Sequence, residues 1–154
     1  MTRIIKTILI IALLALVVIQ FIPVDKNEQG YASIEAFEAE TRPTAEVVEM
    51  LKTNCYDCHS NQTQYPWYAQ IAPVSFWLDD HIKDGKKHFN VSEWASYSTK
   101  KKDHKLDELI EEVKEGEMPL DSYTWVHGGL SEEQQELLVQ WATLARMQYQ
   151  EKVE

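Results

Sequence analysis

Cys55-Tyr56-Asp57-Cys58-His59 is the stretch that organises this chain, and it contains the only two cysteines in the sequence. Thiols three positions apart lie on one helical turn, so both can add across vinyl groups of the same porphyrin. The adjacent His59 can then place its imidazole under the iron as an axial ligand. C-x-x-C-H is the attachment motif of a c-type haem. We therefore expect Cys55, Cys58 and His59 to bind one covalent haem c with its iron, and a fold built around that group.

Three other interpretations of the cysteines are open. A thioredoxin-like dithiol needs a βαβ pattern around C-x-x-C, and the sequence shows none. A structural zinc site needs four ligands, and no second ligand pair accompanies Cys55, Cys58 and His59. A simple disulfide between the two cysteines is compatible with the sequence. Haem attachment is favoured because it alone uses the whole five-residue motif.

The N-terminus carries an apolar segment. Residues 7–24 (TILIIALLALVVIQFIPV) number roughly 18, close to the ~20 that a membrane-spanning helix needs. Arg3 and Lys6 precede the segment, which predicts a cytoplasmic N-terminus and places the remainder outside the inner membrane, in the periplasm. No small-x-small cleavage site follows the segment, so a retained anchor is favoured over a cleaved signal peptide. Export agrees with the motif, because covalent haem is attached outside the cytoplasmic membrane.

The rest of the chain shows helical periodicity and no strand-like alternation of any length. We predict an all-α fold: a cytochrome-c-like small helical domain around a covalent haem, preceded by an N-terminal transmembrane helix. The expected divisions are an anchor or signal segment at 1–24, a polar linker at 25–41 and a haem-binding domain at 42–150. Helices are predicted at residues 34–40, 44–52 and 105–115, and in the stretch that follows a capping box at Ser131. A further helix is predicted from Pro73 to a stop at Gly85, and Gly116 is expected to end the helix at 105–115. Ser92 is expected to cap a short segment, and residues 100–102 are expected to form a solvated turn.

The charge of the chain restricts its partners. The net charge is −10, and removing the two positive charges of Arg3 and Lys6 leaves −12 for the part after the apolar segment. So acidic a surface argues against nucleic acid as a partner. It suits docking onto basic patches of redox proteins, although surplus acid also simply keeps a protein soluble.

An iron bound by His59 alone would have an open sixth position. Met118 is the preferred sixth ligand, because Gly116 ends a helix and Pro119 favours an extended conformation at Met118. Histidine plus methionine ligation raises the potential of cytochromes c. The competing interpretations are a gap-filling methionine, or ligation by His127 in a nearby loop. We expect the remaining histidines at the surface: His81, His88 and His104.

With these motifs in view, the chain resembles a family of small bacterial haem-binding domains found in cytochrome-c-like proteins. The resemblance covers about residues 42 to 145. It rests on 54–61 (NCYDCHSN), 65–68 (YPWY), 71–78 (IAPVSFWL), 81–82 (HI), 89–94 (FNVSEW), 116–120 (GEMPL) and 130–141 (LSEEQQELLVQW). It implies covalent haem c, export, often a membrane anchor, and association with cytochrome c and dihaem peroxidase modules.

These features favour a membrane-anchored periplasmic monohaem cytochrome that carries single electrons between redox partners. The alternatives are a haem-based ligand-binding or sensor protein, an accessory to a peroxidase, or an assembly factor with a structural haem. An enzyme acting alone fits worst. Peroxide chemistry at such an iron usually draws electrons from a second haem, and the sequence contains a single haem motif.

Overall fold

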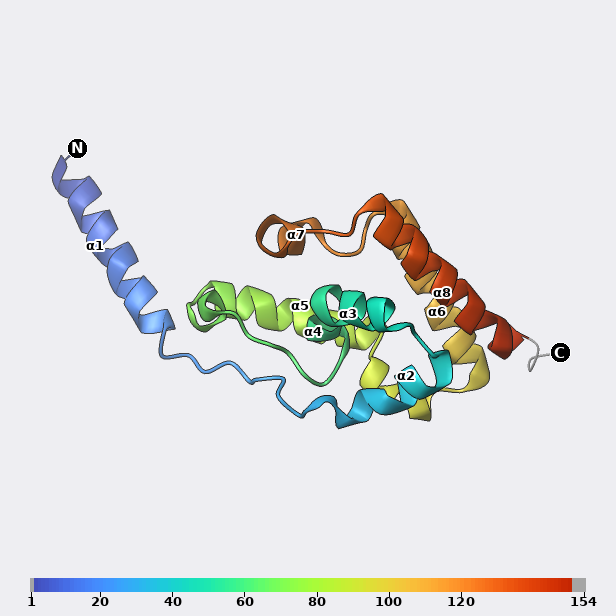
Figure 1. The fold of residues 1–154 in the computed structure, drawn as a ribbon. Coiled ribbons are helices and arrows are strands. Elements are labelled where there is room, and N and C mark those ends of the chain that lie inside the picture. Colours follow the sequence, from blue (N-terminus) through green and yellow to red (C-terminus); the bar gives the residue numbers. More distant parts are fainter. Residues whose placement is uncertain (1, 151–154) are drawn as a thin grey trace.

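The computed structural model describes residues 2–150, and this part of the chain contains helices and no strand, which confirms the all-α prediction (Figure 1). The α-helices are α1 Thr2–Ile19, α2 Glu35–Thr41, α3 Ala45–Asn54, α4 Tyr56–His59, α5 Val74–His88, α6 Thr99–Glu115, α7 Asp121–His127 and α8 Glu132–Gln150. Three short 3-10 helices connect them: η1 Tyr31–Ile34, η2 Trp67–Gln70 and η3 Val91–Ser96.

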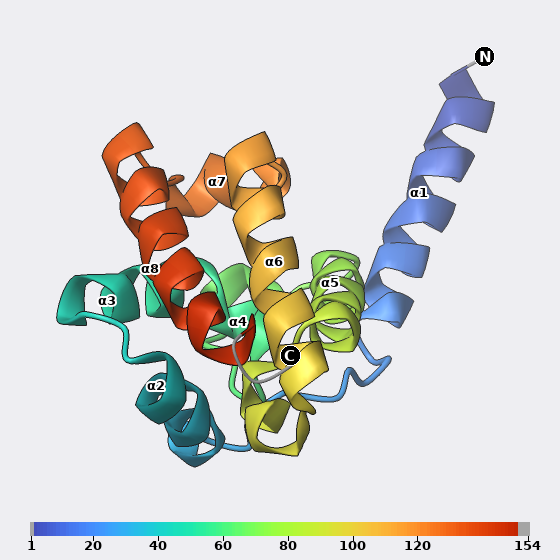
Figure 2. The same ribbon diagram turned by 90° about the vertical axis from the view of Figure 1, so that its right-hand side faces the viewer.

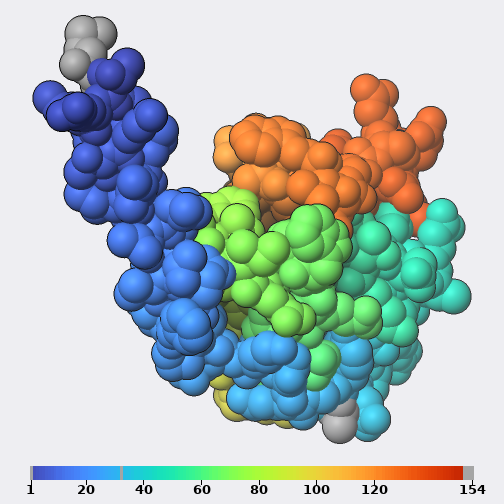
Figure 3. Space-filling view, turned by 90° about the vertical axis from the view of Figure 1, so that its left-hand side faces the viewer, coloured from blue at the N-terminus to red at the C-terminus, as the bar shows by residue number. Residues whose placement is uncertain are grey.

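Helix α1 stands apart from the other helices (Figures 1 and 3). None of its residues is buried, and it is long and apolar enough to cross a membrane. Since its apolar side chains find no protein core, α1 has the character of a membrane span or a signal sequence.

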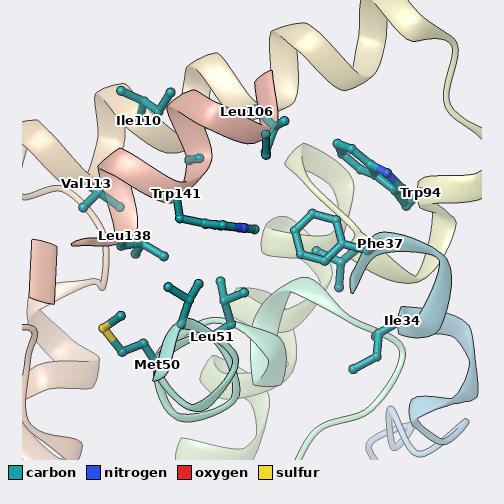
Figure 4. Packing of buried hydrophobic residues seen from close by; sticks show 14 of the residues in the cluster. Ile34, Phe37, Met50, Leu51, Trp94, Leu106, Ile110, Val113, Leu138 and Trp141 are labelled. Atoms are coloured by element: carbon teal, nitrogen blue, oxygen red, sulfur yellow. The ribbon is translucent and has the colours of Figure 1, made fainter. Parts of the chain in front are cut away.

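The core lies where the long helices α6 and α8, which run side by side, meet α2, α3 and η3 (Figures 2 and 4). Phe37 is 0% exposed and sits at its centre. The Phe37 ring meets three aromatic rings edge to face, with centroids 5.0 Å away at Trp94, 6.0 Å at Trp141 and 6.1 Å at Phe89. Such edge-to-face pairs add about 0.5–1.5 kcal/mol each beyond area burial.

Residues 25–41, expected as a polar linker, take part in this packing. Ile34 and Phe37 belong to the core cluster, and Asn27 is buried against the loop that follows the cysteine motif. The linker prediction missed this packing because Ile34 and Phe37 are isolated among polar residues, where periodicity gives no signal.

Several helix ends follow the sequence prediction. Ser131 forms the expected capping box with Gln134: each backbone N–H donates to the other residue's side chain, at 2.9 and 3.2 Å. Gly116 ends α6 in the left-handed conformation at φ 76°. The short segment around Trp94 is capped by Asn90, whose side chain accepts from the Ser92 N–H at 3.0 Å, and not by Ser92.

The basic run at 100–102 is not a solvated turn, because these residues form the first turn of α6. Lys102 is only 9% exposed. Its ammonium group donates to both carboxylate oxygens of Glu40, at 2.7 and 2.9 Å. The same carboxylate accepts from the Trp94 indole and the Tyr149 hydroxyl, so Glu40 joins α2 to η3, α6 and α8. A buried lysine with a distant carboxylate partner gives no local sequence pattern.

Candidate functional site

The cysteine motif is a single helical turn between α3 and α5. Cys55 ends α3, donating its N–H to the Leu51 carbonyl at 2.9 Å. The Cys55 carbonyl then accepts from the N–H groups of Cys58 at 3.2 Å and His59 at 2.9 Å. These bonds place both thiols and the imidazole on the wall of one cavity.

The cavity measures about 810 Å³, within the roughly 300–1,000 Å³ range of cofactor sites. Its walls are formed by helices α3 to α8 and by the loop 116–120. Apolar side chains that also belong to the core cluster line part of it: Leu51, Val91, Val113 and Leu138. The cavity therefore opens into the hydrophobic interior and suits a large apolar group.

The imidazole of His59 is held in one orientation. Its Nδ1 lies 2.9 Å from the backbone carbonyl of Phe89. A carbonyl oxygen can only accept, so Nδ1 carries the proton and Nε2 keeps a free lone pair. Burial lowers the pKa of His59, which keeps the ring neutral. A neutral histidine with its other nitrogen bound to a backbone carbonyl is the usual form of a metal-ligating imidazole.

The Phe89 carbonyl is itself fixed by a network around Asn90, which is buried. The Asn90 side-chain amide donates to Asn61 Oδ1 at 3.0 Å and accepts from the Ser92 N–H. The Asn61 N–H completes the circuit by donating to the Ser92 hydroxyl at 2.8 Å. Residues 89–92 are thus tied to the loop directly after His59. Asn61 and Asn90 therefore have a structural role here.

Gly85 allows α5 to pass against the motif. A Cβ atom at this position would lie 2.8 Å from the carbonyl oxygen of Cys58 and 3.2 Å from Cys58 Cβ. The prediction that Gly85 stops a helix was wrong, since α5 continues to His88. A glycine required for close approach and a glycine at a helix end look alike in one sequence. Gly85 is therefore a site residue that sequence reasoning missed.

The two residues between the cysteines anchor the turn. Tyr56 is fully buried, and its hydroxyl donates to Glu38 at 3.0 Å. The carboxylate of Asp57 accepts from the Gln64 N–H at 2.7 Å. Their side chains hold the turn to α2 and to the following loop, so that the thiols are free to face the cavity.

The two thiols are free cysteines. Burial raises the pKa of Cys55 to about 12 and that of Cys58 to about 11. A dithiol redox centre needs a lowered pKa, so the thioredoxin-like interpretation loses support. Within residues 2–150, no cluster of three or more His, Cys, Asp or Glu residues is arranged as a metal site.

Met118 lines the same cavity as His59. It follows the αL turn at Gly116, where the N–H groups of Glu117 and Met118 both donate to the Glu112 carbonyl, at 3.0 and 3.1 Å. The turn fixes the backbone of Met118 at the end of α6. The structure thus brings together the four site residues predicted first: Cys55, Cys58, His59 and Met118.

His127, the alternative sixth ligand, does not line this cavity. It lies in α7 and not in a loop, and it is exposed. Its Nε2 is 2.6 Å from the Tyr68 hydroxyl, and its ring stacks on Tyr123 at 4.3 Å. His88 is exposed, as expected of a surface residue, and His81 is half-buried; both also line the cavity. His104 is exposed and pairs with Glu108, as expected of a surface residue.

The donor set fits a haem: two thiols on one turn, an oriented imidazole, a thioether and an apolar cavity of adequate size. No curated protein and no solved structure matches the chain. The model of the haem-binding domain family matches residues 14–144, which include the motif, Met118 and the expected linker. The chain therefore belongs to the haem-binding domain family.

Proposed function

We propose that this protein is a membrane-anchored monohaem c-type cytochrome that carries single electrons between redox partners outside the cytoplasmic membrane. The observation that carries the proposal is the shared cavity of Cys55, Cys58, His59 and Met118. Two thiols on one turn suit covalent attachment, and the oriented imidazole suits axial ligation.

Each site residue has a distinct task in this proposal. Cys55 and Cys58 would hold the porphyrin through thioether bonds, formed by addition of each S–H group to a vinyl group with nothing released. His59 would bind the iron through Nε2, and Met118 would bind it through its thioether sulfur. The bound iron supplies a one-electron couple, which histidine and methionine ligation would set at a high potential. The buried apolar residues around the motif exclude water.

Cationic side chains in the cavity wall suit the carboxylate groups that a haem carries. Lys83, Lys87 and Lys105 all line the cavity, although Lys83 also pairs with Asp79 and Lys105 with Glu108. Charge-assisted hydrogen bonds from such groups would orient the cofactor. The same lining also carries carboxylates, Asp80, Asp84, Glu108 and Glu112, so these lysines offer individual partners for the cofactor and do not make the cavity positive as a whole.

The proposed location and partners follow from charge and hydropathy. Helix α1 would be the anchor, with the N-terminus cytoplasmic and the haem domain periplasmic. The acidic surface would meet basic docking patches on redox proteins and would not bind nucleic acid.

A haem-based sensor is the second candidate, because α7 is held loosely over the cavity. None of its residues is buried. It is tied down by two side-chain hydrogen bonds, from the Tyr123 hydroxyl to the Thr53 carbonyl and between Tyr68 and His127. A wall held in this way could open to admit a small ligand. Service as an accessory to a peroxidase would use the same site.

The visible spectrum of the reduced, haem-loaded protein before and after carbon monoxide separates the two candidates. We expect an unchanged Soret band, because two protein ligands leave no position for carbon monoxide. A shifted band would mean an open or weakly held sixth position, and the sensor would then replace the electron carrier. A matched Met118→Ala variant should show the shift even if the wild type does not.

A further inference from the structure

One face of the haem domain exposes large apolar side chains. Trp67 is 78% exposed and Trp125 is 82% exposed. We define the seating face as the exposed apolar residues of η2, α5 and α7 and of the loop between η2 and α5: Trp67, Ile71, Val74, Trp77, Trp125 and Val126. Tryptophan side chains this exposed are unusual unless they mark a contact surface.

The seating face is also uncharged. Residues 58–78 and 122–131 contain no Asp, Glu, Lys or Arg, although such residues form 26% of the chain. Two separate stretches of an acidic protein are therefore neutral where they meet on this face. A surface free of formal charge can leave water without the cost of desolvating ions.

The end of α1 is attached to the same face. The side-chain amide of Gln20 donates to the Ala72 carbonyl and accepts from the Ala72 N–H, both at 3.0 Å. Ala72 lies between Ile71 and Val74 of the seating face. The next residues along the chain, Phe21 and Ile22, are exposed apolar side chains as well. The apolar surface of α1 thus continues into the domain without a gap.

The chain that follows α1 is held against the domain. The Asn27 side chain donates to the Ser60 carbonyl and the Thr63 hydroxyl, both at 2.9 Å, and accepts from Lys86 at 2.7 Å. The Gly30 N–H donates to Gln62 at 2.8 Å. These bonds hold the chain at Asn27 and Gly30 against the loop after the cysteine motif, and the Gln20 bonds hold the end of α1 against Ala72, so both ends of the connecting segment are attached to the domain.

The direction of α1 points the seating face toward the bilayer. In Figures 1 to 3, α1 rises from the start of α5 toward the side of the domain on which α7 lies. A bilayer crossed by α1 would therefore lie over α7 and the first turn of α5. Trp and Tyr prefer the headgroup region of a membrane, where a ring can be half apolar and half hydrated.

We propose that the seating face rests in the interfacial layer of the phospholipid bilayer that α1 crosses, so that the haem domain is held against the membrane in one orientation. The proposal rests on the membrane anchor of the proposed function and adds the orientation. Because Tyr123 of α7 lines the haem cavity, the lipid surface would also steady that wall. Redox partners would then reach the domain from its sides and its far face.

Tryptophan fluorescence in the full-length, haem-loaded protein tests this orientation. The protein is placed in nanodiscs of zwitterionic phospholipid, either plain or brominated on the acyl chain next to the headgroup. Helix α1 contains no tryptophan, so all quenching by bromine reports on the domain. We expect lower fluorescence in brominated discs, and loss of that difference in a W67F/W77F/W125F variant, which leaves the buried Trp94 and Trp141 as reporters.

A second comparison uses a charge. Trp67→Glu should reduce the bromine quenching, whereas Leu144→Glu, at an exposed position on α8, should leave it unchanged. Equal fluorescence in the two kinds of disc, with the protein resistant to alkaline extraction from vesicles, would overturn the seating and leave the anchor intact. Release of the protein by alkaline extraction would overturn both the anchor and the seating.

Discussion

The two walls of the haem cavity are built in different ways. The wall of the cysteine motif is held by close contacts between neighbouring segments. The His59 ring is hydrogen-bonded to the Phe89 carbonyl, the Asn90 side chain is hydrogen-bonded to Asn61, and Gly85 packs against the Cys58 backbone. The opposite wall is the segment from Gly116 through α7, in which no helical residue is buried. Its contacts to the rest of the domain include two tyrosine hydrogen bonds.

The difference between the two walls suggests that one wall serves haem binding and the other controls access to the sixth ligand position. In the proposed function, the rigid wall would fix where the haem attaches, because packing and hydrogen bonds hold its residues in one arrangement. The lighter wall carries the proposed sixth ligand and decides whether that position is closed. An electron carrier and a sensor could therefore share one wall of this fold and differ only in the other.

The strongest test of the rigid wall is Gly85→Ala. The new methyl group would overlap the Cys58 carbonyl at 2.8 Å, so we expect the free energy of unfolding to fall by about 1–3 kcal/mol. Thermal or urea unfolding measures the loss. Gly129→Ala is the matched control, since its Cβ would meet only the Thr124 side chain at 3.4 Å. Equal stability of the two variants would contradict the close approach.

Asn90→Ala tests the support of the Phe89 carbonyl. The change removes a partner from Asn61 and from the Ser92 N–H, which should cost about 1–3 kcal/mol. It should also loosen His59 and so change the visible spectrum of the oxidised haem. Ser96→Ala, an exposed position at the end of the 3-10 helix that Asn90 caps, serves as the control. A destabilised protein with an unaltered spectrum would show that the network does not orient His59.

Met118→Ala should have little effect on stability, because Met118 is only half-buried, but a large effect on ligand binding. We expect covalent haem to be retained, carbon monoxide to bind, and the reduction potential to fall. Met147→Ala, an exposed methionine on α8, is the control. An unchanged oxidised spectrum and no carbon monoxide binding would exclude Met118 as a ligand.

Tyr68→Phe tests how lightly α7 is held. Removing the hydroxyl breaks the bond to His127, and we expect at most about 0.5–1.5 kcal/mol of local stability to be lost. Hydrogen exchange of the α7 amides should rise, while exchange in α4 and α5 stays the same. A uniform rise in the hydrogen-exchange rate across all helices would show that the two walls do not open independently.

The smallest expected effect concerns pH and the core around Glu40. Burial raises the pKa of this carboxyl, but hydrogen bonds from Lys102, Tyr149 and Trp94 lower it by more, so it lies below its ordinary value of 4.5. A carboxyl with a lowered pKa in the folded state stabilises the protein above its unfolded pKa and loses that effect as the pH falls. Glu40→Gln should therefore flatten the decline of stability below about pH 4.5. An unchanged acid profile would contradict this role.

Local patterns made part of this molecule predictable. The Ser131 capping box, the stop at Gly116 and the five-residue motif each depend on neighbours within a few residues. Sequence reasoning failed where a residue contacts one that is distant in the sequence. Gly85 packs against Cys58, Lys102 pairs with Glu40, and Phe37 packs against the aromatic rings of η3 and α8. The cavity-lining positions of His81 and His88 are of the same kind, because they depend on how α5 crosses α4.

The mass of the intact, denatured protein tests the central claim most directly. After expression with c-type maturation machinery, the wild-type chain should retain the mass of one haem under denaturing conditions, and a C55A/C58A variant should retain none. A haem released by acid and solvent from the wild type, or retained by the double variant, would contradict attachment at Cys55 and Cys58.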